Sequence, residues 1–424
     1  RHQEIYRVVL DLAADSKPID PLTIVNELER KGVLEKVGGA AYVTGLEQYV
    51  ISPGNVLHHA KIVHEKSLLR RLIRTSAEIA EDAYTESDDA KSLLQASEQK
   101  IFNILSGRSS AGEFRSIDEE ASQVFLDVVH RAEKRDEVSG LPTGLSDLDK
   151  MTGGMHPSDL MILAARPSVG KTSLALNMAV SACRHKREFG DEFKHPAAAV
   201  FSLEMSRDQL IQRLVCTEAE IPMDLLRKNM MSEKQLRKFQ DGLTALRELP
   251  IYINDTAGLD PTELRLQAQR LKSRVPELSL IVIDYLQLMS IRHSNVENRQ
   301  QEVSQISRML KALARDLNVP VLALSQLSRG VESRTAKDAK PRLSDLRESG
   351  AIEQDADVVM FLHRVFRPER EAGEERGNQP SVSQVDLIIA KQRNGPIGTC
   401  HLLFLEDYTH FVRMAPEDVP PGGH

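Results

Sequence analysis

The stretch LMILAARPSVGKTSLALN (Leu160–Asn177) sets the architecture of the larger part of the chain, because a strand, a loop and a helix follow one another in it. The apolar run LMILAA predicts a buried strand, and SLALNMAVSA predicts a helix. Between them, Gly170, Lys171 and Thr172 offer what a phosphate-binding loop needs: inward backbone N–H groups, an ammonium group for the β and γ phosphates, and a hydroxyl for Mg²⁺. The stretch therefore predicts a nucleotide site.

Ala165 occupies the position at which a phosphate-binding pattern begins with glycine. This position lies at the end of the predicted strand, where alanine fits if its φ is negative. Gly170, which we expect to approach the phosphate closely, is present. Because a short Gly-Lys-Thr sequence also occurs by chance, the assignment depends on the neighbouring segments.

Further apolar runs follow this stretch and alternate with helical patterns. Near-continuous apolar strands separated by helices are typical of a parallel sheet that is covered on both faces. We therefore expect residues 139–424 to form an α/β domain with a mostly parallel sheet and flanking helices. The predicted strands are AAAVFSLE (197–204), LIVIDYLQLM (280–289), VPVLALSQLS (319–328), DVVMFLHR (357–364), VDLIIAKQR (385–393) and CHLLFLE (400–406).

Three polar side chains lie at the ends of these strands. Asp284 is placed to hold the Mg²⁺ shell, Glu204 to polarise a water, and Gln326 to sense the γ-phosphate. Two of them also have a structural interpretation, since Asp284 could form a turn and Glu204 could begin a helix. Ligands gather at the carboxyl ends of strands in open α/β sheets, so the three are predicted to converge near Lys171.

The first part of the chain has a different character. The pattern of residues 1–106 predicts an all-helical domain, in which Asp20 and Pro21 begin one helix and Gly32 ends it. Two amphipathic helices are expected across 55–105, with TESDDA between them. Residues 107–138 predict a linker with an amphipathic helix. Such a domain is either a small helical domain of unassigned purpose or a module for assembly and partner docking.

Composition sets outer limits on the protein. The chain has 424 residues, enough for two or three domains, and begins with Arg1, so we expect its true N-terminus to lie upstream. Apolar runs are too short to span a bilayer, which needs roughly 20 residues. The 3 cysteines are widely spaced, which argues against disulfides and zinc and favours the cytoplasm. The net charge of -7 does not indicate nucleic-acid binding, although a local positive channel is compatible with it.

Over essentially its whole length the chain resembles the DnaB family of bacterial replicative DNA helicases, within the RecA-like ATPases. The family's own phosphate loop also begins with alanine, so Ala165 is no departure from it. The motifs that carry the resemblance are GLPTGLSDLDKMTGG (140–154), AARPSVGKT (164–172), VFSLEMS (200–206), IVIDYLQLM (281–289), LALSQLSR (322–329), SDLRESGAIEQDAD (344–357) and IAKQRNGPIGT (389–399).

The resemblance implies a ring hexamer that uses ATP and Mg²⁺ to move 5′ to 3′ on single-stranded DNA and unwind the duplex. Glu204 would be the catalytic base, Asp284 would support metal and water, and Gln326 would report the γ-phosphate. Arg213, which by position alone favours a solvent-exposed helix residue, would be another nucleotide contact. The phosphates and Mg²⁺ would be held by Ser168, Gly170, Lys171, Thr172 and Ser173.

The segment KQRNGPIG (391–398) ends a predicted strand and enters a tight turn. On spacing alone it could be a basic hairpin facing solvent. By resemblance, Lys391, Gln392 and Arg393 would reach the nucleotide of a neighbouring subunit, with Arg393 as an arginine finger. Such a charge supplied in trans is worth roughly 10³ to 10⁵ in rate.

The resemblance also implies partners. Arg347, Glu348 and Gly350 would contact the phosphates of single-stranded DNA, in a segment (328–350) that is basic and has no aromatic residue for base stacking. The helical domain would form a collar that docks primase, and a helicase loader would act on the ring. A RecA-like ATPase that does not unwind, of the strand-exchange or clock type, is the alternative. The helical domain, RESG and KQRNGPIG favour the helicase.

Overall fold

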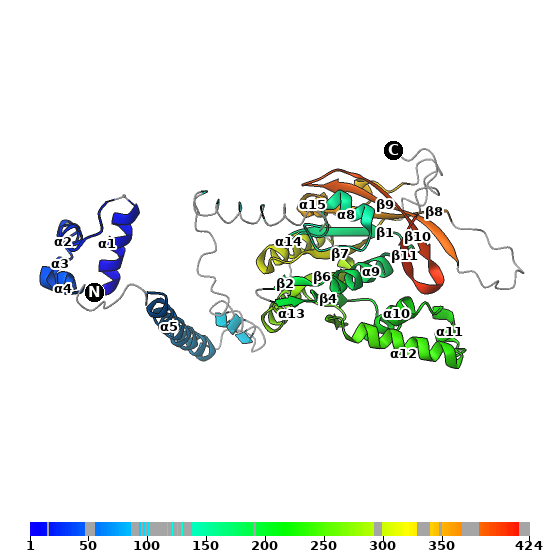
Figure 1. Ribbon diagram of the computed structural model, residues 1–424, viewed down its shortest axis with the longest axis horizontal. Helices are drawn as coiled ribbons and strands as arrows, with labels where there is room; N and C mark the ends of the chain where they lie inside the picture. Colours follow the sequence, from blue (N-terminus) through cyan, green and yellow to red (C-terminus); the bar gives the residue numbers. More distant parts are fainter. Residues whose placement is uncertain are drawn as a thin grey trace, which may run out of the picture. The chain divides into compact units, whose positions relative to one another are not determined.

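The computed structural model describes residues 1–14, 17–46, 56–85, 138–189, 192–291, 299–328, 340–346, 350–366 and 381–414, with isolated positions between 93 and 129. The chain divides into two compact units, Arg1–Arg115 and Ser116–His424 (Figure 1). In the described part of the chain, no helix combines the length and the apolarity that crossing a bilayer requires.

The described residues of the first unit are helical, as predicted. Asp20 caps the second helix, because its carboxylate accepts a hydrogen bond of 2.9 Å from the Thr23 N–H, and Gly32 follows the helix with a φ of 67°. A small core is formed by Ile5, Val8, Leu12, Leu28, Val37 and Val43. The helices are α1 (His2–Ala14), α2 (Pro21–Arg30), α3 (Leu34–Val37), α4 (Gly39–Gly45) and α5 (Val56–Tyr84).

Helix α5 is the first of the two long helices predicted across 55–105. Its apolar side chains at Leu69, Leu72 and Ile73 are exposed. Of the second predicted helix and the linker helix, only isolated positions are described, and these are helical.

The second unit is built on a nine-stranded sheet of order β11-β10-β9-β8-β1-β7-β6-β4-β5. The strands from β8 to β5 in this order are parallel, which confirms the predicted mostly parallel sheet. β9 to β11 continue the sheet as antiparallel strands. The strands are β1 (Leu160–Ala165), β4 (Ala197–Ser202), β5 (Ile251–Asn254), β6 (Leu278–Asp284), β7 (Val321–Gln326), β8 (Val358–Phe366), β9 (Val382–Gln392), β10 (Gly398–Leu405) and β11 (His410–Arg413).

Sequence analysis missed β5 and β11, and the small hairpin of β2 (Arg187–Phe189) and β3 (Glu192–Lys194). β5 and β11 have four residues each and lie at the two edges of the sheet. Edge strands are only partly buried, so they lack the continuous apolar run by which the central strands are recognised.

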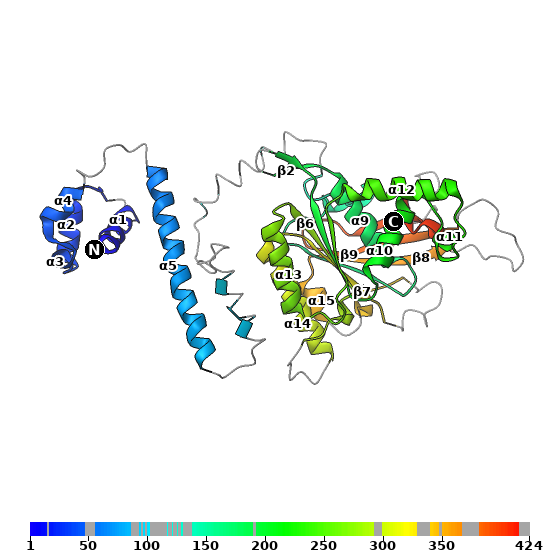
Figure 2. The same ribbon diagram turned by 90° about the horizontal axis from the view of Figure 1, so that it is seen from below.

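Helices cover both faces of the sheet (Figure 2). Along β1 the buried side chains alternate between two cores: Met161 and Leu163 pack with α9 on one face, and Leu160 and Ile162 pack with α14 on the other. The helices are α8 (Ser146–Thr152), α9 (Lys171–Arg184), α10 (Arg207–Ala219), α11 (Met223–Arg227), α12 (Glu233–Arg247), α13 (Pro261–Arg274), α14 (Arg299–Leu317) and α15 (Gly350–Asp355), with short 3-10 turns at 286–288, 343–345 and 406–408.

Candidate active site

The predicted phosphate loop joins the end of β1 to the start of α9. Ala165 is the last residue of β1, fully buried, and pairs with Gln326 of β7 and Leu362 of β8. Its backbone is that of an ordinary extended strand, in which a Cβ is tolerated. The prediction that alanine fits at this position is therefore confirmed.

Gly170 is required by the fold as well as by its place in the loop. Its φ is 108°, and a Cβ there would lie 2.8 Å from Cζ of Phe411. Phe411 is stacked on Phe404, with ring centroids 4.3 Å apart. We expected Gly170 for its approach to phosphate. The structure adds that this aromatic pair, from β10 and β11, packs against the loop at Gly170 and leaves no room for a side chain at that position.

A second support reaches the loop from β8. Arg364 donates a hydrogen bond of 3.0 Å to the carbonyl oxygen of Ser168, a residue with a φ of 63°. The guanidinium group also lies 3.4 Å from the carboxylate of Glu406, which in turn accepts a 2.6 Å hydrogen bond from the hydroxyl of Ser383. Sequence reasoning missed Arg364. Its only signal is a cationic side chain near the carboxyl end of a predicted strand.

A cavity of about 290 Å³ opens beside the loop at the carboxyl ends of the strands. It brings together most of the predicted nucleotide-binding residues. Ser173 does not line it, because its side chain is buried within the first turn of α9. The cavity is lined by Arg166, Pro167, Ser168, Gly170, Lys171, Thr172, Glu204, Met205, Arg213, Tyr285 and Gln326.

Asp284, the last residue of β6, lies beneath this cavity. Its side chain is 3% exposed, and its Oδ2 accepts a hydrogen bond of 2.6 Å from the Thr172 hydroxyl. Its Oδ1 lies 3.7 Å from Lys171 Nζ and has no hydrogen-bond partner among the described residues. A buried carboxylate oxygen left free beside a threonine hydroxyl is the donor set that Mg²⁺ prefers.

Lys171 is held between an acidic group and an aromatic ring. Its ammonium lies 4.0 Å from the ring centroid of Tyr285. Burial lowers the pKa of Lys171, although Asp284 and Glu204 oppose the shift. Burial and the same two carboxylates raise the pKa of Tyr285. Tyr285 was missed by sequence reasoning, although it directly follows Asp284.

Glu204 and Gln326 reach the cavity from β4 and β7, which lie on either side of β6 in the sheet. β4 ends at Ser202, so Glu204 lies in the turn before α10, and its side chain is exposed. Gln326 ends β7, and its N–H donates a 3.2 Å hydrogen bond to the side chain of Gln287. Gln287 also donates a 2.8 Å hydrogen bond to the Ser325 hydroxyl, so it fixes the end of β7. Gln287 carries no recognisable signal in the sequence.

Arg213 of α10 lines the cavity and is only partly exposed. The solvent-exposed position that its place on the helix favoured is therefore wrong. Burial lowers the pKa of its guanidinium, against the charges of Asp284 and Glu204. Its Nε is buried with no hydrogen-bond partner in the described part of the chain. This cation is available to a buried anion.

Lys391, Gln392 and Arg393 lie elsewhere. They end β9 and begin the turn that follows it, at the amino ends of the parallel strands. The Arg393 N–H donates a hydrogen bond of 2.9 Å to the carbonyl of Asp357. The N–H of Asp357 in turn donates a hydrogen bond of 2.9 Å to the carbonyl of Leu160, the first residue of β1. The phosphate loop follows the last residue of β1. At the usual rise of a strand, the two ends of β1 are roughly 17 Å apart. An arginine side chain is too short to bridge this distance.

The predicted DNA-contacting residues are only partly visible. Gly350 is the first residue of α15. Arg347 and Glu348 lie outside the described residues.

Comparison with known proteins extends over both units. Residues 140–413 match the family described as DnaB-like helicase C terminal domain, and residues 1–65 match the DnaB-like helicase N terminal domain. The chain is 42% identical over 425 residues to the Replicative DNA helicase DnaC of Bacillus subtilis (strain 168), across 99% of this chain and 89% of that protein. It is 43% identical over 427 residues to the Replicative DNA helicase DnaB of Geobacillus stearothermophilus, across 99% of this chain and 89% of that one.

Two solved structures share the architecture. One is an ATPase domain that is 36% identical with a TM-score of 0.61, and the match covers 72% of this chain and 100% of that chain. The other, a DnaB-like replicative helicase described together with its interactions with primase, is 31% identical with a TM-score of 0.62, over 97% of this chain and 91% of that chain.

Proposed function

Because this chain belongs to the DnaB family of replicative DNA helicases, as its motifs predict, we propose that ATP hydrolysis beside Lys171 drives it 5′ to 3′ along single-stranded DNA as a ring hexamer. The likeness to replicative helicases extends over nearly the whole chain. That favours unwinding over the alternative of a RecA-like ATPase that does not unwind. A helicase of this family is an ATP-dependent enzyme, so the cavity residues are the natural groups to hold its nucleotide.

The phosphates of ATP would be held at the N-terminus of α9. The loop ending at Gly170 presents backbone N–H groups at the positive end of that helix. Lys171 would bind the β and γ phosphates, and Arg213, with its buried unpartnered Nε, would supply a second cation. Ser168 in the loop and Ser173 behind it would complete the set. The carboxylates of Asp284 and Glu204 attract both of these cations.

Thr172 and Asp284 would hold Mg²⁺, because the hydroxyl and the unpartnered carboxylate oxygen are hard ligands on adjacent side chains. When bound, the ion neutralises charge on the phosphate oxygens. Glu204, exposed to the cavity, would orient the attacking water and accept its proton. Gln326, fixed by Gln287, would respond to the γ-phosphate.

One observation carries the proposal that the site is completed by a second subunit. The cations Lys391 and Arg393 lie at the amino ends of the strands, roughly 17 Å along β1 from the loop. In this chain they cannot reach their own phosphates. In a head-to-tail ring, this edge of one protomer can meet the cavity of the next, with Arg393 as the finger and Lys391 and Gln392 beside it. Hydrolysis would then require assembly.

The remaining contacts follow from the family. Single-stranded DNA would run past Arg347, Glu348 and Gly350 of each protomer. The solved relative described with primase supports a primase-docking role for residues 1–106, with 107–138 as linker and 139–424 as motor. A helicase loader would place the ring on DNA in the bacterial cytoplasm.

A mixing experiment tests the trans site. Rings of Arg393→Ala subunits and rings of Glu204→Ala subunits should each hydrolyse ATP about 10³-fold or more slowly than wild type. Mixed rings should regain activity, since a Glu204→Ala subunit lends its finger to the intact cavity of an Arg393→Ala neighbour. DNA-stimulated ATPase rate against mixing ratio is the measurement, followed by unwinding of a forked duplex with a 5′ tail and a 3′-tailed comparison.

Arg413→Ala is the matched control. Arg413 also belongs to a strand end of the sheet and is similarly exposed, 45% against 48% for Arg393, but its ion-pair partner is Asp147 of α8 rather than Asp357. Its loss should leave turnover at the wild-type level. No recovery at any mixing ratio would contradict the trans finger.

A further inference from the structure

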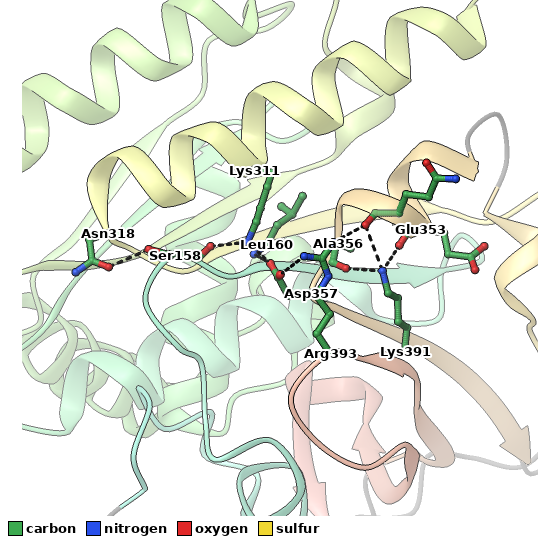
Figure 3. Close-up of polar contacts among 10 residues, drawn as sticks. Ser158, Leu160, Lys311, Asn318, Glu353, Ala356, Asp357, Lys391 and Arg393 are labelled. Atoms are coloured by element: carbon green, nitrogen blue, oxygen red, sulfur yellow. Dashed lines mark hydrogen bonds and ion pairs between the residues drawn. The ribbon is translucent and has the colours of Figure 1, made fainter. Parts of the chain in front are cut away.

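A second buried carboxylate, Asp357, lies beside the proposed finger (Figure 3). Its side chain is 7% exposed. Oδ2 accepts hydrogen bonds from the N–H of Leu160 at 2.7 Å and from Nζ of Lys311 at 2.5 Å. Lys311 belongs to α14 and also donates to the carbonyl of Ser158 at 2.8 Å. Asp357 is therefore firmly anchored between β1, β8 and α14.

Arg393 takes a looser place on the same carboxylate. Its guanidinium lies 3.5 Å from Oδ1 of Asp357 and donates a 2.7 Å hydrogen bond to the carbonyl of Gln354. Lys391 donates to the carbonyls of Ala356, at 2.8 Å, and of Glu353. Both cations therefore rest on the C-terminal carbonyls of α15, the negative end of that helix (Figure 3).

These contacts compete with the role that Arg393 has in the proposed function. A guanidinium held by Asp357 and Gln354 of its own protomer is not free to turn toward a neighbour's γ-phosphate. The hold is weak, because the Arg393 side chain is 48% exposed and the ion pair is long. Exposed pairs of this kind are easily broken, so a small change at Asp357 or α15 can shift the balance.

We propose that Asp357 is a positioning residue that retains Arg393 in its own protomer through the end of α15, and so sets how readily the finger engages the next subunit. The proposal rests on the proposed function of Arg393. The proposal also gives DNA a way to act on the finger, through the start of α15. α15 begins at Gly350, the residue assigned to DNA by resemblance, and its six residues span only about 9 Å. DNA bound at the start of this helix shifts the carbonyls that hold the finger at its end.

Two substitutions separate this role from a structural one, because they remove the same ion pair but act oppositely on Arg393. Asp357→Asn keeps an oxygen for the Leu160 N–H and removes the charge that attracts the finger. Lys311→Met keeps the carboxylate and removes the nearer of its two cations, which leaves Asp357 to Arg393.

Without DNA, the ATPase kcat of assembled rings should rise about two- to fivefold in Asp357→Asn and fall by a similar factor in Lys311→Met, the scale of one exposed ion pair. The KM for ATP should stay within about twofold, since the cavity is unchanged. The extra stimulation by DNA should shrink in Asp357→Asn, and the gain should vanish when Arg393→Ala is added.

Asp149→Asn is the matched control. Asp149 is a buried carboxylate in α8 that also accepts a backbone N–H, that of Thr143 at 2.9 Å, but among the described residues it makes no hydrogen bond or ion pair with Arg393. It should leave kcat unchanged. Changes of the same sign in Asp357→Asn and Lys311→Met, or no change in either, would overturn the proposal. Wild-type turnover in Arg393→Ala alone would instead remove the proposed function.

Discussion

The two ends of the parallel strands, called here the carboxyl edge and the amino edge of the sheet, differ in how their charged groups are held. At the carboxyl edge, Asp284 is 3% and Lys171 is 13% exposed, and both are enclosed by β6, α9 and Tyr285. At the amino edge, the side chain of Arg393 is 48% exposed, lies 3.5 Å from the carboxylate of Asp357 and donates a 2.7 Å hydrogen bond to the carbonyl of Gln354 in α15. The first arrangement preorganises a binding site within one protomer. The second keeps a cation at the surface, where another protomer can use it.

This difference suggests a division of labour within one chain. Binding of a nucleotide depends on groups whose positions the fold fixes, so it needs no neighbour. In the proposed function, completion of hydrolysis depends on Arg393, whose side chain the fold leaves exposed, so hydrolysis would be conditional on assembly and on DNA.

The largest expected effect is the loss of the carboxyl edge. Lys171→Ala should lower the ATPase kcat by about 10²–10³-fold and weaken ATP binding as well, because the ammonium is both a ground-state and a transition-state contact. Arg393→Ala should leave the Kd for ATP within a few fold. For both variants, the Kd for ATP is measured by equilibrium titration and the kcat by an ATPase assay, which compares the two edges directly. Equal losses of binding in the two variants would erase the distinction.

A smaller effect sharpens the account of how the carboxyl edge is built. Gly170→Ala should lower the free energy of unfolding by about 3 kcal/mol, because it adds a strained positive φ to a clash with Phe411. Gly258→Ala, at a φ of 62° with nothing within 4 Å of its Cβ, should cost only about 1 kcal/mol. Chemical unfolding of both variants measures the difference. Equal costs would mean that the aromatic pair yields to a side chain.

The smallest effect concerns the DNA that the amino edge is proposed to sense. Affinity for single-stranded DNA should fall steeply with salt, and Arg347→Ala should reduce the slope of log affinity against log salt by about 0.7, the value of one phosphate contact. Titration of a fluorescent oligonucleotide across a range of salt is the measurement, with Arg413→Ala for comparison. A salt dependence that is flat in the wild type would rule out phosphate tracking.

The sequence predicted much of the carboxyl edge because each of its residues is tied to a local pattern. Lys171 and Thr172 follow a strand and open a helix, and Asp284 ends an apolar run, so β and α periodicity alone located them. Ala165 was correctly predicted to be tolerated for the same reason. Parallel strands then brought these ends together, as the topology of such sheets requires.

Other parts of the site had no local pattern to reveal them. Arg364 and the pair Phe404 and Phe411 support the phosphate loop from strands some 200 residues later in the chain. By its place on the helix alone, Arg213 favoured a solvent-exposed position, because a helix surface looks alike whether water or a cavity lies beside it; the nucleotide contact was predicted only by the family resemblance. Only packing against the sheet showed which it was.

The order of residues along the chain was enough to predict the α/β class and the nucleotide loop, because strand and helix periodicity and the residues at strand ends are local properties. The family was predicted by the resemblance of its motifs. Which side chains meet across the sheet was decided only by the tertiary structure. Folding set Arg393 at the edge opposite the loop, gave it Asp357 and the end of α15 as partners, and placed the aromatic pair under Gly170. These are contacts between residues far apart in the chain, and they exist only once the strands are ordered side by side.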